Sequence, residues 1–459
     1  MTADSIDAQL FYQKGLKELW QENYVAALTC FQKATEKNPQ DAHIWFQLGY
    51  CYDNLGRYQD AIEPYKQAIR INPDYAEAHS NLGKTYGGLN RYQDMIESLK
   101  QAIRIKPDDA DTHYGLGLVY SILGRYQDAI ESYKQTIRIK PDFADAHSNL
   151  GLAYDKLGRY QDAVESYKQA IRIKPDDAVA HYNLGVAYSN LGRYQDAAES
   201  LKQAIKIKPD DAVAHYNLGV TYVNLGRHQD AIESYKQAIR INPDYADAHY
   251  NLGVTYGKLG HHQEAIESYK QAIRINPDYA DAHNNLGAAY GKLGRWQEAV
   301  ESCKQAIRIE PDYADAHNNL GAAYGKLGRH QDAIECYKQD IKIKPDYADT
   351  HYDLGVAYGK LGRHQDAAES FKQAIRINPN FADAHNNLGA AYIGLHRYRD
   401  AIEPFKQAIR IKPDLATAHY GLGVAYLAVG DKGSALEEYK ILKTLDTELA
   451  NKLFNLIYK

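Results

Sequence analysis

Apolar and polar positions along the chain follow the period of an α-helix. In the stretch ADAHNNLGAAYGKLGR, residues 280–295, about 100° of rotation per residue places most apolar side chains on one arc and most polar ones on the other. The arc expected to be buried holds Ala282, His283, Leu286, Gly287, Ala289, Tyr290 and Leu293. The arc expected to be open holds Asp281, Asn284, Asn285, Ala288, Gly291 and Lys292.

A second helix is expected to follow the first. Gly294 suits the left-handed conformation that ends a helix, and Asn90 and His396 are expected to adopt it where the glycine is missing. Residues 297–309, QEAVESCKQAIRI, begin with acids and end with bases, as the helix dipole favours, and Pro311 prevents continuation. Asp278, which follows the preceding proline of this series, is expected to cap the first helix.

This helix pair recurs along the whole chain. The stretch 280–295 returns letter for letter at 314–329, and proline recurs every 34 residues from Pro39 to Pro413. We expect a leader (1–7), thirteen tandem repeats (8–449) and residues 450–459 as the end of a C-terminal capping helix. Because Thr447 replaces the proline there, that helix is expected to continue without a break. The repeats begin at residues 8, 42, 76, 110, 144, 178, 212, 246, 280, 314, 348, 382 and 416.

Six positions of this period resemble a known family. With Ala280 as repeat position 1, positions 7, 8, 11, 20, 27 and 32 carry Leu286, Gly287, Tyr290, Ala299, Ala306 and Pro311. The chain resembles the tetratricopeptide repeat (TPR) family over nearly its whole length. The resemblance implies an all-α fold, a right-handed superhelical solenoid of about thirteen helix-turn-helix repeats with a concave groove lined by the first helices. It also implies binding of proteins or peptides rather than catalysis.

Composition argues against several classes of partner. Lys plus Arg (54) nearly balance Asp plus Glu (59), so no strong field favours nucleic acid or an anionic membrane. The four cysteines form no CxxC motif, which suits a reducing compartment, and neither a secretory signal nor a long apolar run is present. The sequence therefore predicts a soluble cytoplasmic scaffold without nucleic-acid binding or membrane insertion.

The recurring histidine at repeat position 4, His283 here, is expected to be a packed ring with one hydrogen-bonded nitrogen. Histidines spaced one per repeat are too far apart to share a metal ion. No nucleophile motif or phosphate-binding loop is present either, so we predict no enzyme activity, no cofactor and no metal site.

Asparagine at repeat position 6 is a poor helix former on the open arc. One interpretation is a ladder of amides that holds the main chain of an extended peptide, because an amide both donates and accepts hydrogen bonds. This resembles the asparagine ladders of peptide-binding TPR superhelices. The other interpretation is duplication of a harmless polar residue. The ladder comprises Asn81, Asn149, Asn183, Asn217, Asn251, Asn285, Asn319 and Asn387.

Other open-arc residues complete the predicted groove. Small or branched apolar residues at position 9 leave width for a ligand. Aspartates at position 2 and lysines at position 13 give a mixed charge that argues against a partner of a single sign. The predicted lysines are Lys258, Lys292, Lys326 and Lys360.

Three further features depart from the simple repeat. Asp340 stands where most repeats have alanine and is expected to be partly exposed or hydrogen-bonded, because a buried unpartnered carboxylate is costly. Asp353 replaces the groove asparagine of its repeat. Phe454 and Tyr458 widen the apolar arc of the last helix, so the alternative function is end-to-end self-assembly into a filament. A capped monomer remains the leading interpretation.

Overall fold

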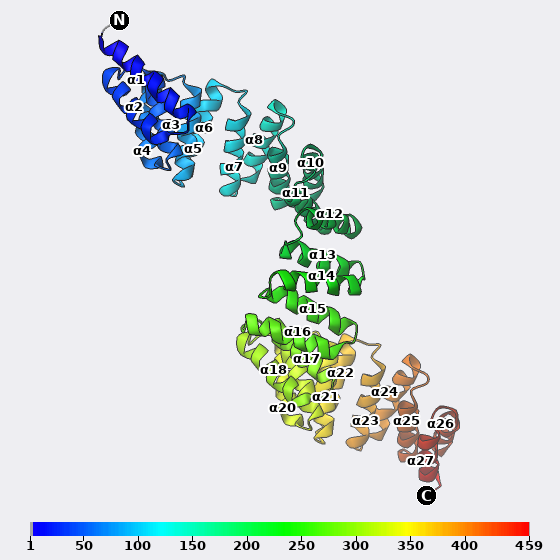
Figure 1. Cartoon of the computed structure of the whole chain (residues 1–459). Coiled ribbons are helices and arrows are strands. Elements are labelled where there is room, and N and C mark those ends of the chain that lie inside the picture. Colours follow the sequence, from blue (N-terminus) through cyan, green and yellow to red (C-terminus); the bar gives the residue numbers. More distant parts are fainter. Residues whose placement is uncertain (1–2, 459) are drawn as a thin grey trace. The chain divides into compact units, whose positions relative to one another are not determined.

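The computed structural model describes residues 3–458, and these form α-helices joined by short turns, with no strand in this range (Figure 1). The chain divides into two compact units, Met1–Arg227 and His228–Lys459. Unit 1 contains α1 (Ala3–Trp20), α2 (Tyr24–Lys37), α3 (Ala42–Asn54), α4 (Tyr58–Ile71), α5 (Ala76–Gly88), α6 (Tyr92–Ile105), α7 (Ala110–Ile122), α8 (Tyr126–Ile139), α9 (Ala144–Lys156), α10 (Tyr160–Ile173), α11 (Ala178–Asn190), α12 (Tyr194–Ile207) and α13 (Ala212–Asn224).

Unit 2 continues the same alternation. It contains α14 (His228–Ile241), α15 (Ala246–Lys258), α16 (His262–Ile275), α17 (Ala280–Lys292), α18 (Trp296–Ile309), α19 (Ala314–Lys326), α20 (His330–Ile343), α21 (Ala348–Lys360), α22 (His364–Ile377), α23 (Ala382–Gly394), α24 (Tyr398–Ile411), α25 (Ala416–Ala428), α26 (Lys432–Leu445) and α27 (Thr447–Ile457). We call the odd-numbered helices from α1 to α25 first helices and the even-numbered ones second helices. Within each unit, each helix packs against the helix that follows it in the chain.

A close approach between the two helices of each repeat determines the core. In α7 and α8, a methyl group on Gly117 would lie 2.5 Å from Cε1 of Tyr133, so only glycine fits beneath this ring. Tyr133 is fully buried there. The small residue and the large ring are thus two halves of one contact, which most repeats of the chain reproduce.

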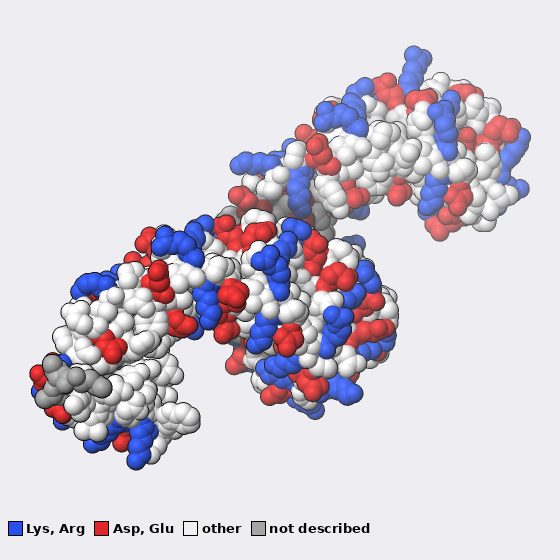
Figure 2. All heavy atoms as spheres, turned by 90° about the horizontal axis from the view of Figure 1, so that it is seen from above, with Lys and Arg blue, Asp and Glu red and all other residues white. Residues whose placement is uncertain are grey.

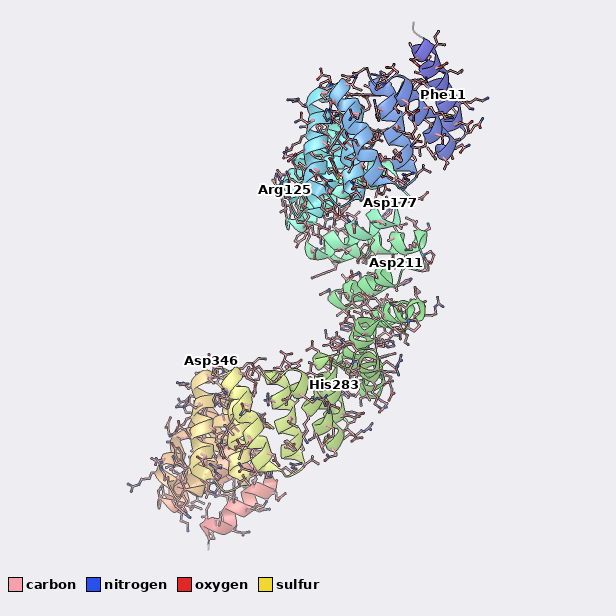
Figure 3. All side chains as sticks on the ribbon, turned by 90° about the vertical axis from the view of Figure 1, so that its left-hand side faces the viewer. Phe11, Arg125, Asp177, Asp211, His283 and Asp346 are labelled. Carbon is pink, nitrogen blue, oxygen red and sulfur yellow. The ribbon has the colours of Figure 1, made fainter. Side chains whose placement is uncertain are left out.

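The turn within each repeat joins three interactions. Gly294 has a φ of 73°, and Asn90 and His396 both have a φ of 57°, which confirms the expectation for these two residues. The guanidinium of Arg125, which Figure 3 labels, lies 4.5 Å from the centre of the Tyr120 ring. Its Nε also donates to Asp128 at 2.8 Å. The turn is therefore held by cap conformation, cation–π contact and ion pair together.

The prediction that Asp278 caps the first helix was wrong. The residue directly before α17 is Tyr279, which makes no side-chain cap, since the helix begins one residue later than the prediction assumed. Aspartate stands in that place before four first helices; Asp41, Asp177 and Asp211 cap their helices, whereas Asp109 makes no cap hydrogen bond. Asp177 and Asp211 each accept from two backbone N–H groups at the starts of α11 and α13 (Figure 3).

The structure also adds detail at both ends of the chain. α1 begins at Ala3, so residues 3–7 of the predicted leader are helical. The prediction of an uninterrupted C-terminal helix was wrong, because α26 ends at Leu445 and α27 begins at Thr447. Asp446 has an extended backbone and accepts from the Leu449 N–H at 3.0 Å, so it starts a new helix.

The position-4 histidines connect consecutive repeats. Nε2 of His283, which Figure 3 labels, lies 3.0 Å from the carbonyl oxygen of Pro277, six residues earlier in the inter-repeat turn. Trp45 replaces histidine in its repeat and donates from Nε1 to the carbonyl oxygen of Pro39 at 2.9 Å. The expected hydrogen bond to one ring nitrogen is confirmed. The same bond, at 2.9–3.1 Å, occurs at His79, His113, His147, His181, His215, His249, His283, His317, His351, His385 and His419.

His419 has a second partner, which changes its pKa. Its Nδ1 lies 2.6 Å from Oε2 of Glu438, and both side chains are largely buried. The hydrogen bond to this carboxylate raises the pKa of His419, while burial opposes the rise. At His249, which lacks such a partner, burial instead lowers the pKa.

We predict that this pair makes the last repeat more stable at low pH. Since the folded pKa of His419 lies above the unfolded value of about 6.5, the pair's contribution is complete below that unfolded value and is lost as the pH rises through the folded pKa. Glu438→Gln should lower the pKa of the His419 ring measured by NMR and flatten the loss of thermal stability between about pH 6 and pH 9. His385 in the same sample is the control, and an unchanged His419 titration would contradict the prediction.

Candidate functional site

The first helices present a shared face, which we call the first-helix surface and define by repeat positions 6, 9 and 13. On α17 these positions are Asn285, Ala288 and Lys292. All eight asparagines predicted for the ladder are half-buried, and the lysines are exposed. Position 9 carries small or branched side chains, Val186, Val220, Val254, Ala288, Ala322 and Val356, so backbone and amide groups lie close to the surface.

Four of the eight position-6 amides bond to a tyrosine of the preceding first helix. The Nδ2 atom of Asn285 donates to the Tyr250 hydroxyl at 3.0 Å, across 35 residues of sequence. The Tyr250 ring in turn lies 4.9 Å from the ring of Tyr279 in the inter-repeat turn. The asparagine thus joins successive first helices, a packing role that the sequence interpretation missed. Equivalent bonds to tyrosine hydroxyls are made by Asn149, Asn217 and Asn387 at 2.8, 3.0 and 3.1 Å.

The remaining ladder residues vary in their contacts. Asn319 donates to Oδ1 of Asn284 at 2.9 Å, where the preceding helix has asparagine in place of tyrosine. Asn284 is only 5% exposed, so its expected place on the open arc was wrong. Asn81 hydrogen-bonds to Tyr65 of α4. Asn251 is half-buried. Asn183 follows a helix with Ser148 at the tyrosine position, and within residues 3–458 its side chain makes no hydrogen bond.

The mixed charge predicted for the open arc separates into two edges, with the position-2 aspartates beside the first-helix surface and the position-13 lysines at its other end. Asp281 and Lys292 lie at opposite ends of α17, about 16 Å apart at 1.5 Å per residue. The aspartate edge is engaged by neighbouring turns, since Asp247 accepts from the Tyr279 hydroxyl at 3.0 Å and Asp315 from Lys344 at 2.7 Å. Elsewhere on the face drawn in Figure 2, side chains of both signs are interspersed.

Three equivalent pockets open along the lysine edge of unit 2, and we name each by its second helix. The α16 pocket (about 280 Å³) holds His262 with Lys258 and Lys292. The α20 pocket (about 250 Å³) holds His330 with Lys326 and Lys360, and the α22 pocket (about 450 Å³) holds His364 with Lys360. Their floors are the buried rings of Tyr269, Tyr337 and Phe371.

Asp340 confirms the expectation of hydrogen bonding, although it is buried. It is 2% exposed and accepts from the Thr350 hydroxyl at 2.5 Å and from Nδ2 of Asn318 at 3.3 Å. Asn318 also donates to Thr350 at 3.1 Å. These three polar residues form one closed network, so each substitution in it compensates the others.

The same network changes the neighbouring position of the surface. Asn318 is the equivalent of Asn284 one repeat later. Asn284 accepts a hydrogen bond from the position-6 amide of the next repeat, Asn319, whereas Asn318 donates to Asp340. The next position-6 residue is Asp353, which lines the α20 pocket. Burial, reinforced by the nearby Asp349 carboxylate, raises the pKa of Asp353 to about 6, against the attraction of Lys326.

The residues suggested for self-association lie on α27 and the residue after it. Phe454 is 40% exposed and Tyr458 60% exposed, and their rings lie 4.6 Å apart. Within the described part of the chain, no group of three or more His, Cys, Asp or Glu side chains is arranged to hold a metal ion. No helix among residues 3–458 is long and apolar enough to cross a membrane.

Comparison with known families supports the pattern of helices and contacts. A family model described as the C-terminal domain of cilia and flagella-associated protein 70 matches residues 2–215 and 210–387, and one described as the TPR repeat matches residues 396–430. The chain belongs to the tetratricopeptide repeat family. The resemblance inferred from the sequence and its all-α repeat fold are thus confirmed. A comparison with curated protein sequences gives no match.

Several solved TPR structures are similar to parts of this TPR chain. The crystal structure of MamA protein is 33% identical, with a TM-score of 0.36, and the match covers 37% of this chain and 93% of that one. MamA from Desulfovibrio magneticus RS-1 is 22% identical, with coverages of 37% and 96% and a TM-score of 0.36. YrrB, titled a TPR protein with an unusual peptide-binding site, is 23% identical, with coverages of 41% and 96% and a TM-score of 0.37.

We predict that the asparagine–tyrosine bond stabilises unit 1 of the TPR array. Asn149→Ala leaves the Tyr114 hydroxyl without its partner and should lower the free energy of unfolding by about 1 kcal/mol. Asn183→Ala, one repeat further along, removes the same side chain opposite Ser148 and should have a smaller effect. Urea unfolding midpoints of both variants test the difference. Equal shifts would show that the bond contributes nothing.

Proposed function

We propose that this TPR chain is a non-catalytic scaffold whose first-helix surface binds an extended segment of another protein. The observation that carries the proposal is the combination of half-buried amides, small side chains and local pockets on one face. Half-buried polar groups beside apolar floors suit a ligand that brings both main-chain hydrogen bonds and side chains. No cofactor or metal takes part.

The amide ladder is part of this proposal. A tyrosine hydroxyl takes one N–H of the Asn149, Asn217, Asn285 and Asn387 amides. Asn217 also donates to the Val213 carbonyl oxygen, and the amide oxygens of Asn285 and Asn387 each accept from the preceding asparagine. Each amide still has at least one lone pair for a ligand, and those of Asn149, Asn285 and Asn387 also have a second N–H. These groups suit the N–H and C=O groups of an extended main chain, whatever its sequence. Because the tyrosine already orients the amide, less side-chain entropy is lost on binding.

Each hydrogen bond of this kind adds about 0.5–1.5 kcal/mol. Useful affinity therefore requires several amides acting in one unit. The eight ladder residues and the four position-13 lysines are the residues that we assign to this role, with the lysines at the edge of the surface rather than at its centre.

To test the binding face, peptides are selected against the whole chain from a random library and their Kd is measured. Ala288→Trp combined with Ala322→Trp fills the first-helix surface of unit 2 and should weaken binding there by at least about tenfold, through steric exclusion. Glu301→Trp with Glu335→Trp places the same rings on exposed positions of α18 and α20 as the matched control. Equal loss in both variants, or in neither, would contradict the proposal.

A second candidate, end-to-end self-association, is favoured by the exposure of Phe454 and Tyr458. Such a contact would be heterologous and could extend into a filament. Light scattering over a wide concentration range tests it. A constant mass is the result expected of a monomeric scaffold, whereas a mass that rises with concentration and falls back in Phe454→Ser would support self-association.

A further inference from the structure

Four consecutive first helices of unit 2 end in the same residue, although α23 and α25 end in Gly394 and Ala428. The helices α15, α17, α19 and α21 all end in lysine, at Lys258, Lys292, Lys326 and Lys360. The helix dipole favours a cation there. In unit 1, however, the same position carries Trp20, Asn54, Gly88, Ile122, Lys156, Asn190 and Asn224. The fold therefore does not require the lysines, and their presence in four consecutive repeats calls for another cause.

These four lysines lack the ion pairs that the second-helix lysines of the same repeats make. All four are exposed, and none makes an ion pair with another residue of the described chain. Four lysines on the second helices of those repeats pair with a glutamate at 3.4–3.8 Å, namely Lys270, Lys304, Lys338 and Lys372. The first-helix lysines of unit 2 thus have no ion-pair partner, although Asp353 lies near Lys326, whereas the second-helix lysines are paired.

The pockets place a second nitrogen donor beside these lysines. His262, His330 and His364 are half-buried at the starts of their second helices, each lining a pocket with one or two of the lysines. In unit 1 the same position carries tyrosine, as at Tyr126 and Tyr160. A carboxylate that enters a pocket could accept from both the imidazole and the ammonium group, and charge-assisted bonds of this kind are the strong ones.

We propose that the α16, α20 and α22 pockets receive the acidic side chains of an extended peptide segment of another protein. This inference rests on the proposed function and adds to it the chemistry of the ligand. Packed helices lie about 8–10 Å apart, and three residues of extended chain span about the same distance. In a peptide with glutamate at every third position, the spacing between glutamates therefore matches the spacing between successive repeats.

Asp353 makes the α20 pocket the weakest of the three. It stands at the position of Asn285 in the α16 pocket and Asn387 in the α22 pocket. The charged groups facing it are Lys326 from α19, His330 from α20, and Asp349 and Lys360 from α21. When Asp353 is ionised it repels an incoming carboxylate, so acidic ligands bind this pocket best when Asp353 is neutral.

A peptide fits this surface better than a nucleic acid does. Single-stranded nucleic acids bind through bases stacked on accessible aromatic side chains. The rings beneath these pockets, Tyr269, Tyr337 and Phe371, are at most 5% exposed and are covered by their repeats. A carboxylate on a short side chain reaches the lysine and histidine nitrogens without such a stacking platform.

The test uses the full chain and a labelled peptide of about 15 residues with glutamate at every third position, compared with the same peptide carrying glutamine. The glutamate peptide should bind at least about tenfold more tightly. Replacing Lys258, Lys292, Lys326 and Lys360 by glutamine should weaken the binding of the glutamate peptide about tenfold. The matched control replaces Lys270, Lys304, Lys338 and Lys372 by glutamine, which changes the net charge equally, and should leave binding within about twofold.

Three outcomes would overturn the inference. If the glutamine peptide binds equally, the surface binds peptides but does not select acidic ones, and the proposed function survives. If neither peptide binds, the acidic-ligand assignment fails, while selection from the random library decides the proposed function separately. If a single-stranded oligonucleotide binds more tightly than the glutamate peptide, and replacing the same four lysines by glutamine abolishes its binding, the surface binds nucleic acid.

Asp353→Asn tests for a gain of affinity, because it gives the α20 pocket the asparagine that the α16 and α22 pockets have at this position. The variant should bind the glutamate peptide about two- to fivefold more tightly than the natural chain near neutral pH. The gain should shrink below about pH 6, where Asp353 becomes protonated. Weaker binding, or a gain that does not depend on pH, would contradict the role assigned to this pocket.

Discussion

The hydrogen bond from a position-4 ring nitrogen to the proline carbonyl six residues earlier is the contact on which the regularity of this TPR array depends. Proline ends each second helix, and carbonyl groups near a helix end have no partner within the helix. The histidine, or Trp45 in its repeat, supplies that partner from the following first helix. Each turn is thereby fixed against the helix that it precedes, so successive first helices present the same residues on the same face.

The first-helix surface serves packing and recognition through the same side chains. Asn285 bonds to Tyr250 of the previous repeat, and Tyr250 packs on Tyr279, so the amide is held before any ligand arrives. The network of Asn318, Asp340 and Thr350 shows the consequence of a change in this arrangement. Because Asn318 hydrogen-bonds to Asp340, it is not a partner for position 6 of the next repeat. That position holds Asp353 in place of asparagine.

Much of the fold could be predicted from the sequence, because the information lies within single repeats. Helix period, the glycine or Asn90 at the turn and the proline stop are local features that one repeat encodes completely. Contacts between repeats could not be predicted in the same way. A helical wheel gives the direction of Asn284 on its own helix but not what the next repeat places over it, so its burial beside Asn319 was missed. The tyrosine partners, 35 residues away, could have been found by comparing positions 5 and 6 of consecutive repeats.

The central claim is that the first-helix surface of this chain is its binding face. A crystal structure of the full chain with a library-selected peptide tests it most directly. The account predicts an extended peptide across the first helices of one unit, with main-chain hydrogen bonds to position-6 amides such as Asn285. A peptide bound to the second helices, or to the surface around Phe454 and Tyr458, would contradict it.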